Sequence, residues 1–103
     1  MILEVSNYQT SNCSGKLLLQ FYDGGLYDVW FYPDDVKSYL DQLKKEGLDL
    51  AYTDLRKENL FFDKSKEIQR NGLKIWYASD GESKQYIGRE DIQKGQQIEE
   101  TND

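Results

Sequence analysis

Residues 17–47 read LLLQFYDGGLYDVWFYPDDVKSYLDQLKKEG and predict a β-hairpin followed without a gap by an α-helix. Leu17–Tyr22 and Leu26–Tyr32 are rich in aliphatic and aromatic residues, as paired strands are. Asp23-Gly24-Gly25 separates them, and three turn residues favour a bulged turn over the tight two-residue kind. Because Leu26–Tyr32 carries large side chains on both faces, we expect this strand to lie inside the sheet.

The helix is predicted over Pro33–Glu46. Pro33 suits the first helical turn, and Asp34 and Asp35 suit the positive end of a helix dipole. Gly47 follows the last turn as the residue that ends the helix. The apolar stripe of the helix consists of Val36, Tyr39, Leu40 and Leu43. This stripe predicts that the helix packs across one face of the sheet.

Further strands are predicted on both sides of this segment. They are Ile2–Tyr8, Lys66–Arg70, Leu73–Ala78 and Lys84–Ile87, with Leu48–Thr53 as one more candidate. In Ile2–Tyr8 the alternation predicts that Leu3 and Val5 face inward. The fold class that follows is α+β: an antiparallel sheet of about five or six strands with one main helix, residues 33–46, across a face.

Residues 63–70 allow two interpretations. Asn71-Gly72 is a typical hairpin turn before Leu73, which favours a strand, but Asp63 could also cap a short helix. Towards the C-terminus, Arg89–Lys94 suits one helical turn, and residues 95–103 are polar and acidic. We therefore expect one domain over residues 1–94 and a flexible acidic tail over residues 95–103.

A looser copy of the hairpin and helix recurs near the C-terminus. Asp23-Gly24 aligns with Asp80-Gly81, and Asp34-Asp35-Val36 aligns with Glu90-Asp91-Ile92. A strand, a turn, a strand and an acidic helix start form a common pattern. Chance similarity is therefore favoured over a true repeat.

The chain is acidic, with a net charge of −6, and its acids are concentrated at both ends. Residues 1–35 and 75–103 each carry a net charge of −4, whereas residues 36–74 carry +2. Direct binding to nucleic acid is not expected, because neutralising phosphates needs clustered Lys and Arg. A basic protein partner is expected instead, although surplus acid also serves solubility alone.

The residue types exclude several kinds of site. With one cysteine, Cys13, and no histidine, neither a disulfide framework nor a zinc site is expected. Nucleophilic hydrolases usually depend on histidine, and no phosphate-binding loop is present, so we expect no enzyme, no metal and no cofactor. No secretion signal or apolar run of membrane-spanning length is recognisable, which predicts a cytoplasmic protein that does not enter membranes.

Aromatic residues give the strongest indication of binding. Alternation places Leu26, Asp28, Trp30 and Tyr32 on one face of their strand and Tyr27, Val29 and Phe31 on the other. One helix cannot cover all of these rings, and exposed Tyr and Trp are typical anchors for a protein partner. The predicted partner-binding residues are Tyr22, Asp23, Tyr27, Asp28, Trp30, Tyr32, Asp34 and Asp35. For Asp34 and Asp35, capping the helix is the favoured simpler role.

The leading hypothesis is a small non-enzymatic interaction module that presents aromatic and acidic residues to a basic, nucleic-acid-handling protein. The acids would imitate the phosphates of a nucleic acid, as in an inhibitor from a virus or mobile element or an immunity protein against a toxin. An accessory subunit of a larger complex is a further possibility. The alternative from another class is a small-ligand binding module, oligomeric, with a Tyr/Trp-lined pocket.

Overall fold

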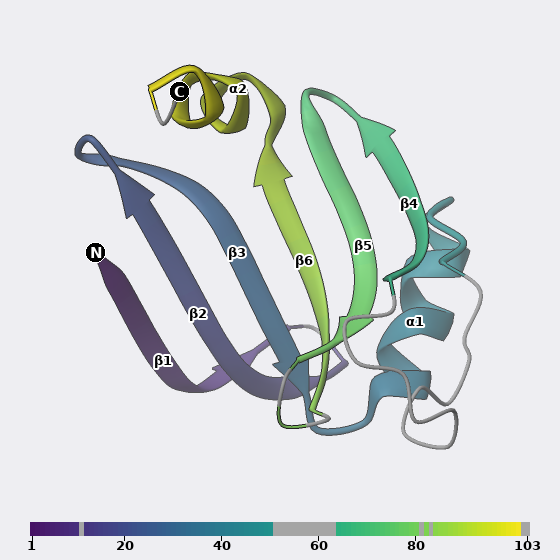
Figure 1. Ribbon diagram of the computed structural model, residues 1–103. Helices are drawn as coiled ribbons and strands as arrows, with labels where there is room; N and C mark the ends of the chain where they lie inside the picture. Colours follow the sequence, from purple (N-terminus) through teal and green to yellow (C-terminus); the bar gives the residue numbers. More distant parts are fainter. Residues whose placement is uncertain (11, 51–63, 81, 83, 102–103) are drawn as a thin grey trace.

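The computed structural model describes residues 1–10, 12–50, 64–80, 82 and 84–101, and these form one antiparallel sheet with helices beside it (Figure 1). The strands are β1 (Ile2–Gln9), β2 (Ser14–Tyr22), β3 (Gly25–Pro33), β4 (Lys64–Arg70), β5 (Leu73–Ser79) and β6 (Gln85–Asp91). The helices are α1 (Val36–Lys45) and α2 (Ile92–Thr101). The predicted α+β class, with six strands and one main helix packed on the sheet, is confirmed.

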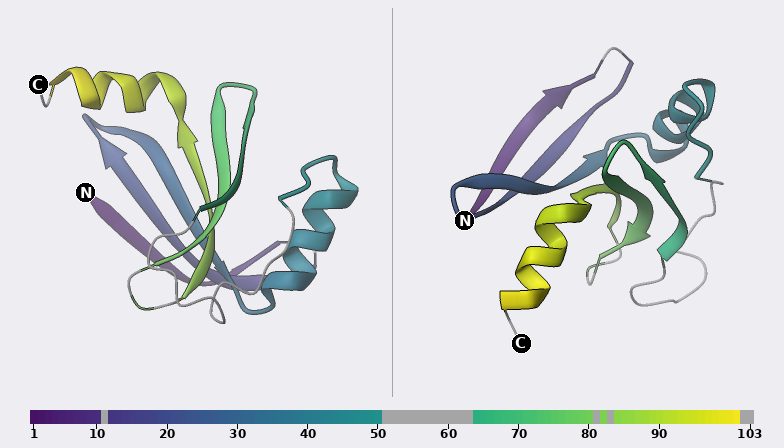
Figure 2. Two further views of the ribbon diagram at one scale, coloured as in Figure 1. Left: turned by 45° about the vertical axis from the view of Figure 1, so that its right-hand side comes forward. Right: turned by 90° about the horizontal axis from the view of Figure 1, so that it is seen from above.

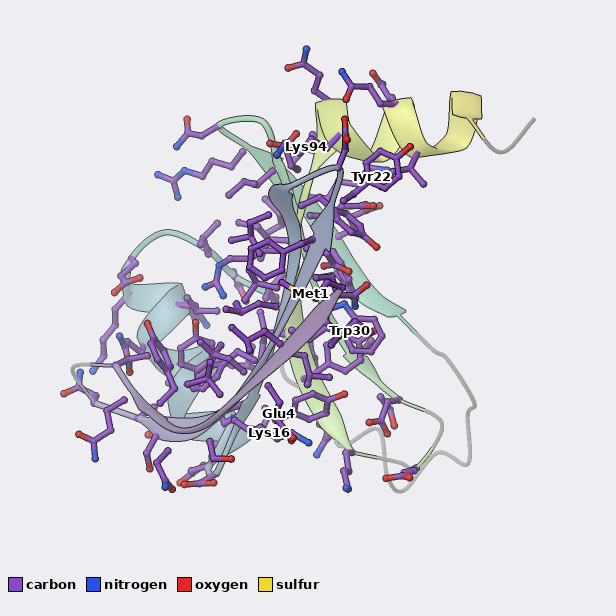
Figure 3. All side chains as sticks on the ribbon, turned by 90° about the vertical axis from the view of Figure 1, so that its left-hand side faces the viewer. Met1, Glu4, Lys16, Tyr22, Trp30 and Lys94 are labelled. Atoms are coloured by element: carbon purple, nitrogen blue, oxygen red, sulfur yellow. The ribbon has the colours of Figure 1, made fainter. Side chains whose placement is uncertain are left out.

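The strand order is β1-β2-β3-β6-β5-β4, so two three-stranded meanders join where β3 pairs with β6. Each meander is followed by a helix, and the residues that the sequence aligns, Asp23 with Asp80 and Asp35 with Asp91, stand at equivalent turns and helix starts. The helices nevertheless lie on opposite sides of the sheet (Figures 2 and 3). If symmetry related the two meanders, its two-fold axis would run perpendicular to the sheet between β3 and β6 and would leave both helices on the same side. The shared order of elements is therefore not a symmetric repeat.

The turn between β2 and β3 is tighter than the sequence predicts. Tyr22 pairs with Gly25, which leaves Asp23 and Gly24 as the only two turn residues. Both have positive φ angles, 51° and 79°, as hairpins with two-residue turns require. The expected three-residue bulged turn is therefore wrong, although a register shift does occur further along the hairpin, where Tyr27 is inserted in β3 opposite Gln20 and Phe21.

Helix α1 begins three residues later than predicted. Pro33 is the last residue of β3, and Asp35 has an extended backbone and caps the helix by accepting a hydrogen bond from the Ser38 amide at 3.1 Å. At the other end Gly47 has a φ of 93°, and the Leu48 amide donates to the Leu43 carbonyl at 2.8 Å. This arrangement is a Schellman motif, and it confirms Gly47 as the residue that ends the helix.

The main core lies between α1 and one side of the sheet, which we call the helix face. Its buried residues are Phe31, Tyr39, Leu40, Leu43, Leu50, Ile75, Tyr77 and Ile87. The Phe31 ring meets the Tyr39 ring edge to face at 4.8 Å, and the Arg89 guanidinium donates to the Tyr39 hydroxyl at 2.8 Å. The predicted apolar stripe thus does cover the sheet.

The ends of the chain differ in detail from the prediction. The hairpin β4–β5 over Asn71-Gly72 is confirmed in place of the short helix. Leu3 lies opposite Leu19, on the face of the sheet that carries Phe31, as predicted, but 48% of its surface is exposed because β1 is the edge strand. Helix α2 continues to Thr101, through most of the stretch predicted as a tail. Residues 48–50 form no strand, and the rest of the candidate strand, residues 51–53, lies outside the described residues.

Candidate functional site

The side of the sheet away from α1 carries a group of rings that we call the aromatic face. It consists of Tyr22, Tyr27, Trp30 and Tyr32 from the first meander and Trp76 and Tyr86 from the second. Figure 3 shows the sheet almost edge-on, with α1 on one side and Trp30 and Tyr22 on the other. Helix α2 lies on this same side, at the end of the sheet where β6 finishes.

The bulge in β3 decides which way Tyr27 points. In the β2–β3 register, Asp28 pairs with Gln20 and Leu26 pairs with Phe21, so Tyr27 is an extra residue between them. Its hydroxyl donates to the Gln20 side chain at 3.0 Å, and its ring meets Tyr22 edge to face at 6.4 Å. Tyr27 therefore shares the face of Asp28 and Trp30, and the simple alternation predicted for this strand is wrong here.

The centre of the aromatic face is a packed cluster around Tyr86. Trp30 stacks on Tyr86 with ring centroids 4.2 Å apart and an interplanar angle of 16°. Tyr32 lies against the same ring at 5.5 Å, and Trp76 meets it edge to face at 6.4 Å. Gly88 lies between Trp30 and Trp76 in the same row of the sheet, and its missing side chain leaves the space that the Trp76 indole fills.

Hydrogen bonds fix the polar ends of these rings. The Trp30 indole donates to Asp28 at 2.9 Å, the Trp76 indole donates to the Tyr86 hydroxyl at 3.3 Å, and the Tyr32 hydroxyl donates to Asp80 at 3.0 Å. Burial raises the pKa of Tyr86, and burial together with the bond to Asp80 raises the pKa of Tyr32. Both tyrosines are thus neutral hydrogen-bonding groups over the physiological pH range.

Asp80 holds the turn between β5 and β6 and connects it to the aromatic face. One carboxylate oxygen accepts from the backbone amides of Glu82 and Lys84, each at 2.9 Å, and the other accepts from Tyr32. Burial alone would raise the pKa of Asp80, but these three donors outweigh it and hold the pKa below its usual value. The carboxylate is therefore charged at neutral pH and serves to position Tyr32.

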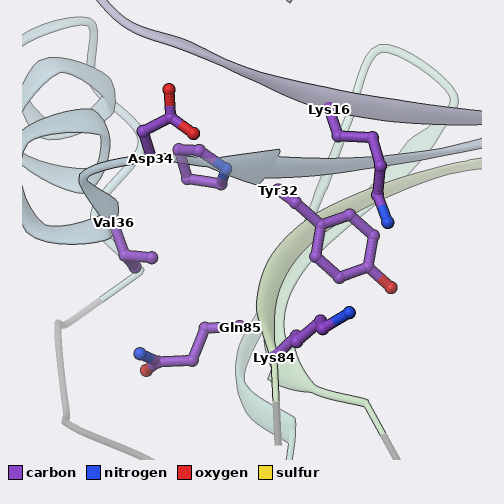
Figure 4. Close-up of a pocket in the computed structure, with 7 residues that line it drawn as sticks. Lys16, Tyr32, Asp34, Val36, Lys84 and Gln85 are labelled. Atoms are coloured by element: carbon purple, nitrogen blue, oxygen red, sulfur yellow. The ribbon is translucent and has the colours of Figure 1, made fainter. Parts of the chain in front are cut away.

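A pocket of about 440 Å³ opens beside Tyr32 (Figure 4). Its lining residues are Lys16, Tyr32, Pro33, Asp34, Val36, Lys84 and Gln85. The Lys16 ammonium lies 4.7 Å from the centre of the Tyr32 ring and 3.5 Å from Glu4, and Lys84 pairs with Glu82 at 3.1 Å. Each of the two cations is thus matched by a carboxylate, and the pocket contains one aromatic ring.

The predicted acids separate into different roles. Asp23 is exposed in the β2–β3 turn, whereas Asp28 is buried beneath Trp30. Asp34 accepts a hydrogen bond from the Ser14 hydroxyl at 2.8 Å, and Asp35 caps α1. Among the contacts of the described residues, Asp23 is the only one of these four acids that is exposed and accepts no hydrogen bond from a neighbouring side chain or helix amide. The structure thus brings the four predicted rings onto one face, but Asp28 is buried there, and Asp34 and Asp35 accept hydrogen bonds from Ser14 and Ser38.

Sequence reasoning missed Trp76, Tyr86 and Asp80 as members of this face. Trp76 lies in the predicted strand Leu73–Ala78 and Tyr86 in the predicted strand Lys84–Ile87, and alternation within each strand was a usable signal. The pairing of β3 with β6, which places Tyr86 beneath Trp30, joins residues more than fifty positions apart. Such a pairing has no local sequence signal.

Comparisons with known proteins do not extend this description. No family model, no curated protein and no solved structure gives a significant match to the chain. Within the described residues, no group of three or more His, Cys, Asp or Glu side chains is placed to hold a metal ion. Neither α1 nor α2 is long and apolar enough to span a bilayer.

Proposed function

We propose that this protein is a non-enzymatic binding module that holds a basic protein partner on its aromatic face. The observation that carries the proposal is the gathering of Tyr22, Tyr27, Trp30 and Tyr32 on one side of two paired strands, each ring partly exposed. Tyr and Trp with one end fixed and one face open provide large contact areas and dominate binding energies at protein interfaces.

The rings are already ordered before any partner binds. Trp30 is fixed by its stack on Tyr86 and by its bond to Asp28, and Tyr32 is fixed by its bond to Asp80. Immobilising a flexible side chain on binding costs about 0.5–1.5 kcal/mol, so a rigid ring loses less free energy when it is covered. This order favours a preformed binding surface over one that forms on contact.

The charge favours a basic partner. Lys16 and Lys84, the cations beside Tyr32, each pair with a glutamate, so they do not form a basic patch. The chain as a whole carries a net charge of −6, and the two turns that border the aromatic face expose Asp23 and the ion-paired Glu82. An inhibitor or immunity protein that imitates nucleic-acid phosphates before a basic, nucleic-acid-handling partner would have this character.

We expect Trp30→Ala and Tyr27→Ala to weaken the complex mainly by raising the dissociation rate, each by roughly thirtyfold or about 2 kcal/mol. The partner is captured from the native host with the wild-type chain, purified, and its kinetics are measured by surface plasmon resonance. Far-UV circular dichroism checks that the variants fold. Tyr8→Ala is the matched control, because Tyr8 is 40% exposed but lies against Phe31, away from the aromatic face. Unchanged dissociation rates for both ring variants would contradict the proposal.

We expect the association rate to fall as salt rises, because exposed acids steer a basic partner. Asp23→Asn combined with Glu82→Gln should lower this rate several-fold at low salt and flatten its salt dependence. Asparagine suits the positive φ of Asp23, so the turn is preserved. Glu46→Gln, at the end of α1, is the control for an exposed acid on the other side of the sheet. Equal association rates at low and high salt would exclude the acidic steering.

The pocket beside Tyr32 favours a second candidate function, a small-ligand binding module. Its volume of about 440 Å³ lies within the usual range for ligand sites, which is roughly 300–1,000 Å³. A neutral ligand there would bind almost independently of salt, and Tyr27→Ala, remote from the pocket lining, would leave its affinity unchanged. The two experiments above therefore separate the candidates.

A further inference from the structure

The outer edge of β1 is the most exposed apolar part of the described chain. Met1, Ile2 and Leu3 are 81%, 65% and 48% exposed, and β1 is the last strand on its side of the sheet. In Figure 3 β1 lies nearest the viewer, with no other element in front of it. Natural proteins usually protect such an edge with charges, and β4, at the opposite edge, has the charged sequence KSKEIQR. The start of β1, ILEV, has only Glu4.

The backbone of β1 directs a second set of hydrogen-bonding groups towards this edge. Met1 is bonded to β2, since the Phe21 amide donates to the Met1 carbonyl at 2.9 Å. Bonded and non-bonded positions alternate along an antiparallel ladder, so Leu3 and Val5 also bond to β2. The amides and carbonyls of Ile2 and Glu4 therefore point outward, as a template for another strand.

We propose that the occupant of this edge is a second copy of the same chain, with the two β1 strands pairing antiparallel about a two-fold axis. Residues that pair across the two copies must lie on the same face of the joined sheet, and they must bond through the outward amides and carbonyls. These two conditions allow only a few registers. Opposing Glu4 with Glu4 of the second copy would place like charges together. The register shift after Val5 and the positive φ of Asn7 end the flat part of the strand.

Two registers satisfy these conditions, and only one of them uses the outward groups of both Ile2 and Glu4. This register pairs Ile2 with Glu4 of the second copy through the outward groups, and it places Leu3 opposite Leu3 of the second copy on the axis. Pairing the two edges covers at most the exposed surface of residues 1–5 in both copies, on the order of 1,000 Å², which is near the lower limit for specific interfaces. An interface of this size fits a weak, reversible dimer that forms as the protein concentration rises. This self-association uses a different surface from the proposed partner site.

Sedimentation of the full chain over a concentration series tests the dimer. We expect the wild-type mass to rise from monomer towards dimer over this range, and Leu3→Lys to weaken the association at least tenfold. Lysine is tolerated in the monomer because Leu3 is half exposed. The control is Gln69→Lys, an exposed position on β4 at the other edge, which should leave the dimer unchanged. A wild-type chain that is monomeric throughout, or that grows beyond a dimer, would overturn the proposal.

Two further variants distinguish the predicted register from a general effect of charge. Leu3→Glu alone should also be monomeric, but mixed with Leu3→Lys it should restore a mixed dimer, because the two positions meet on the axis. Glu4→Pro removes an outward amide and the exposed ion pair with Lys16 but leaves the β1–β2 backbone bonds in place, so it should block the dimer and keep the fold. A dimer that survives Leu3→Lys and Glu4→Pro lies elsewhere, which rejects this edge. Binding of the captured partner to Leu3→Lys, measured in parallel, reports on the aromatic face alone.

Discussion

Gly88→Val is expected to lower the free energy of unfolding by about 4 kcal/mol or more, a large part of the stability of a small domain. A side chain at Gly88 would collide with the Trp76 indole, whose Cη2 atom lies 2.7 Å from the position of an added Cβ. The indole cannot easily move aside, because it is buried and donates to the Tyr86 hydroxyl. Urea unfolding followed by tryptophan fluorescence and by circular dichroism measures the loss.

Two comparisons separate this collision from a general glycine effect. Gly24→Ala meets no atom within 4 Å and should cost only about 1 kcal/mol, because Gly24 has a positive φ of 79°. Trp76→Ala should make Gly88→Val much less harmful, so the double variant should lose clearly less than the two single losses added together. A loss below ~1 kcal/mol for Gly88→Val would mean that the indole does not lie over Gly88.

Leu43→Ala and Leu40→Ala are each expected to cost about 2–5 kcal/mol, because both side chains are almost fully buried between α1 and the sheet. The cavity left under the helix cannot be filled by its buried neighbours without rearrangement. Lys44→Ala, an exposed residue in the last turn of the same helix, should change stability by no more than about 0.5 kcal/mol. If both leucine variants lost less than ~0.5 kcal/mol, α1 would lie outside the core.

The sequence predicts the parts of the fold that depend on local signals. The hairpin, the apolar stripe of α1 and the Asn71-Gly72 turn follow from residues within a few positions of one another, and all three are present. Pro33 was misplaced because proline suits both the end of a strand and the first turn of a helix, and the extended backbone at Asp35 decides between them. Leu3 points to the predicted face but is half exposed, because alternation gives the direction of a side chain and does not show whether another element covers it.

The candidate site was predicted in part, and the misses share a physical cause. Alternation fails at Tyr27 because the backbone inserts one residue there, and nothing in the residue types marks that insertion. Asp28 was expected to be exposed as an acid, but Trp30 bonds to it and covers it. Tyr86 joins the face only through the pairing of β3 with β6. The pairing of strands that are distant in sequence and the position of a bulge depend on how the whole sheet packs, and neighbouring residues do not reveal them.

The strand order also has a consequence for the rate at which the chain folds. Within each meander, neighbouring strands follow one another in sequence, so each can form through short loops. The β3–β6 pair is different, because Trp30 must find Gly88 across more than half of the chain. Closing so long a loop costs conformational entropy before any new contact stabilises the chain, so this step slows folding. The step that joins the meanders also brings Trp30 onto Tyr86, so the aromatic face is completed only when the slowest contacts form.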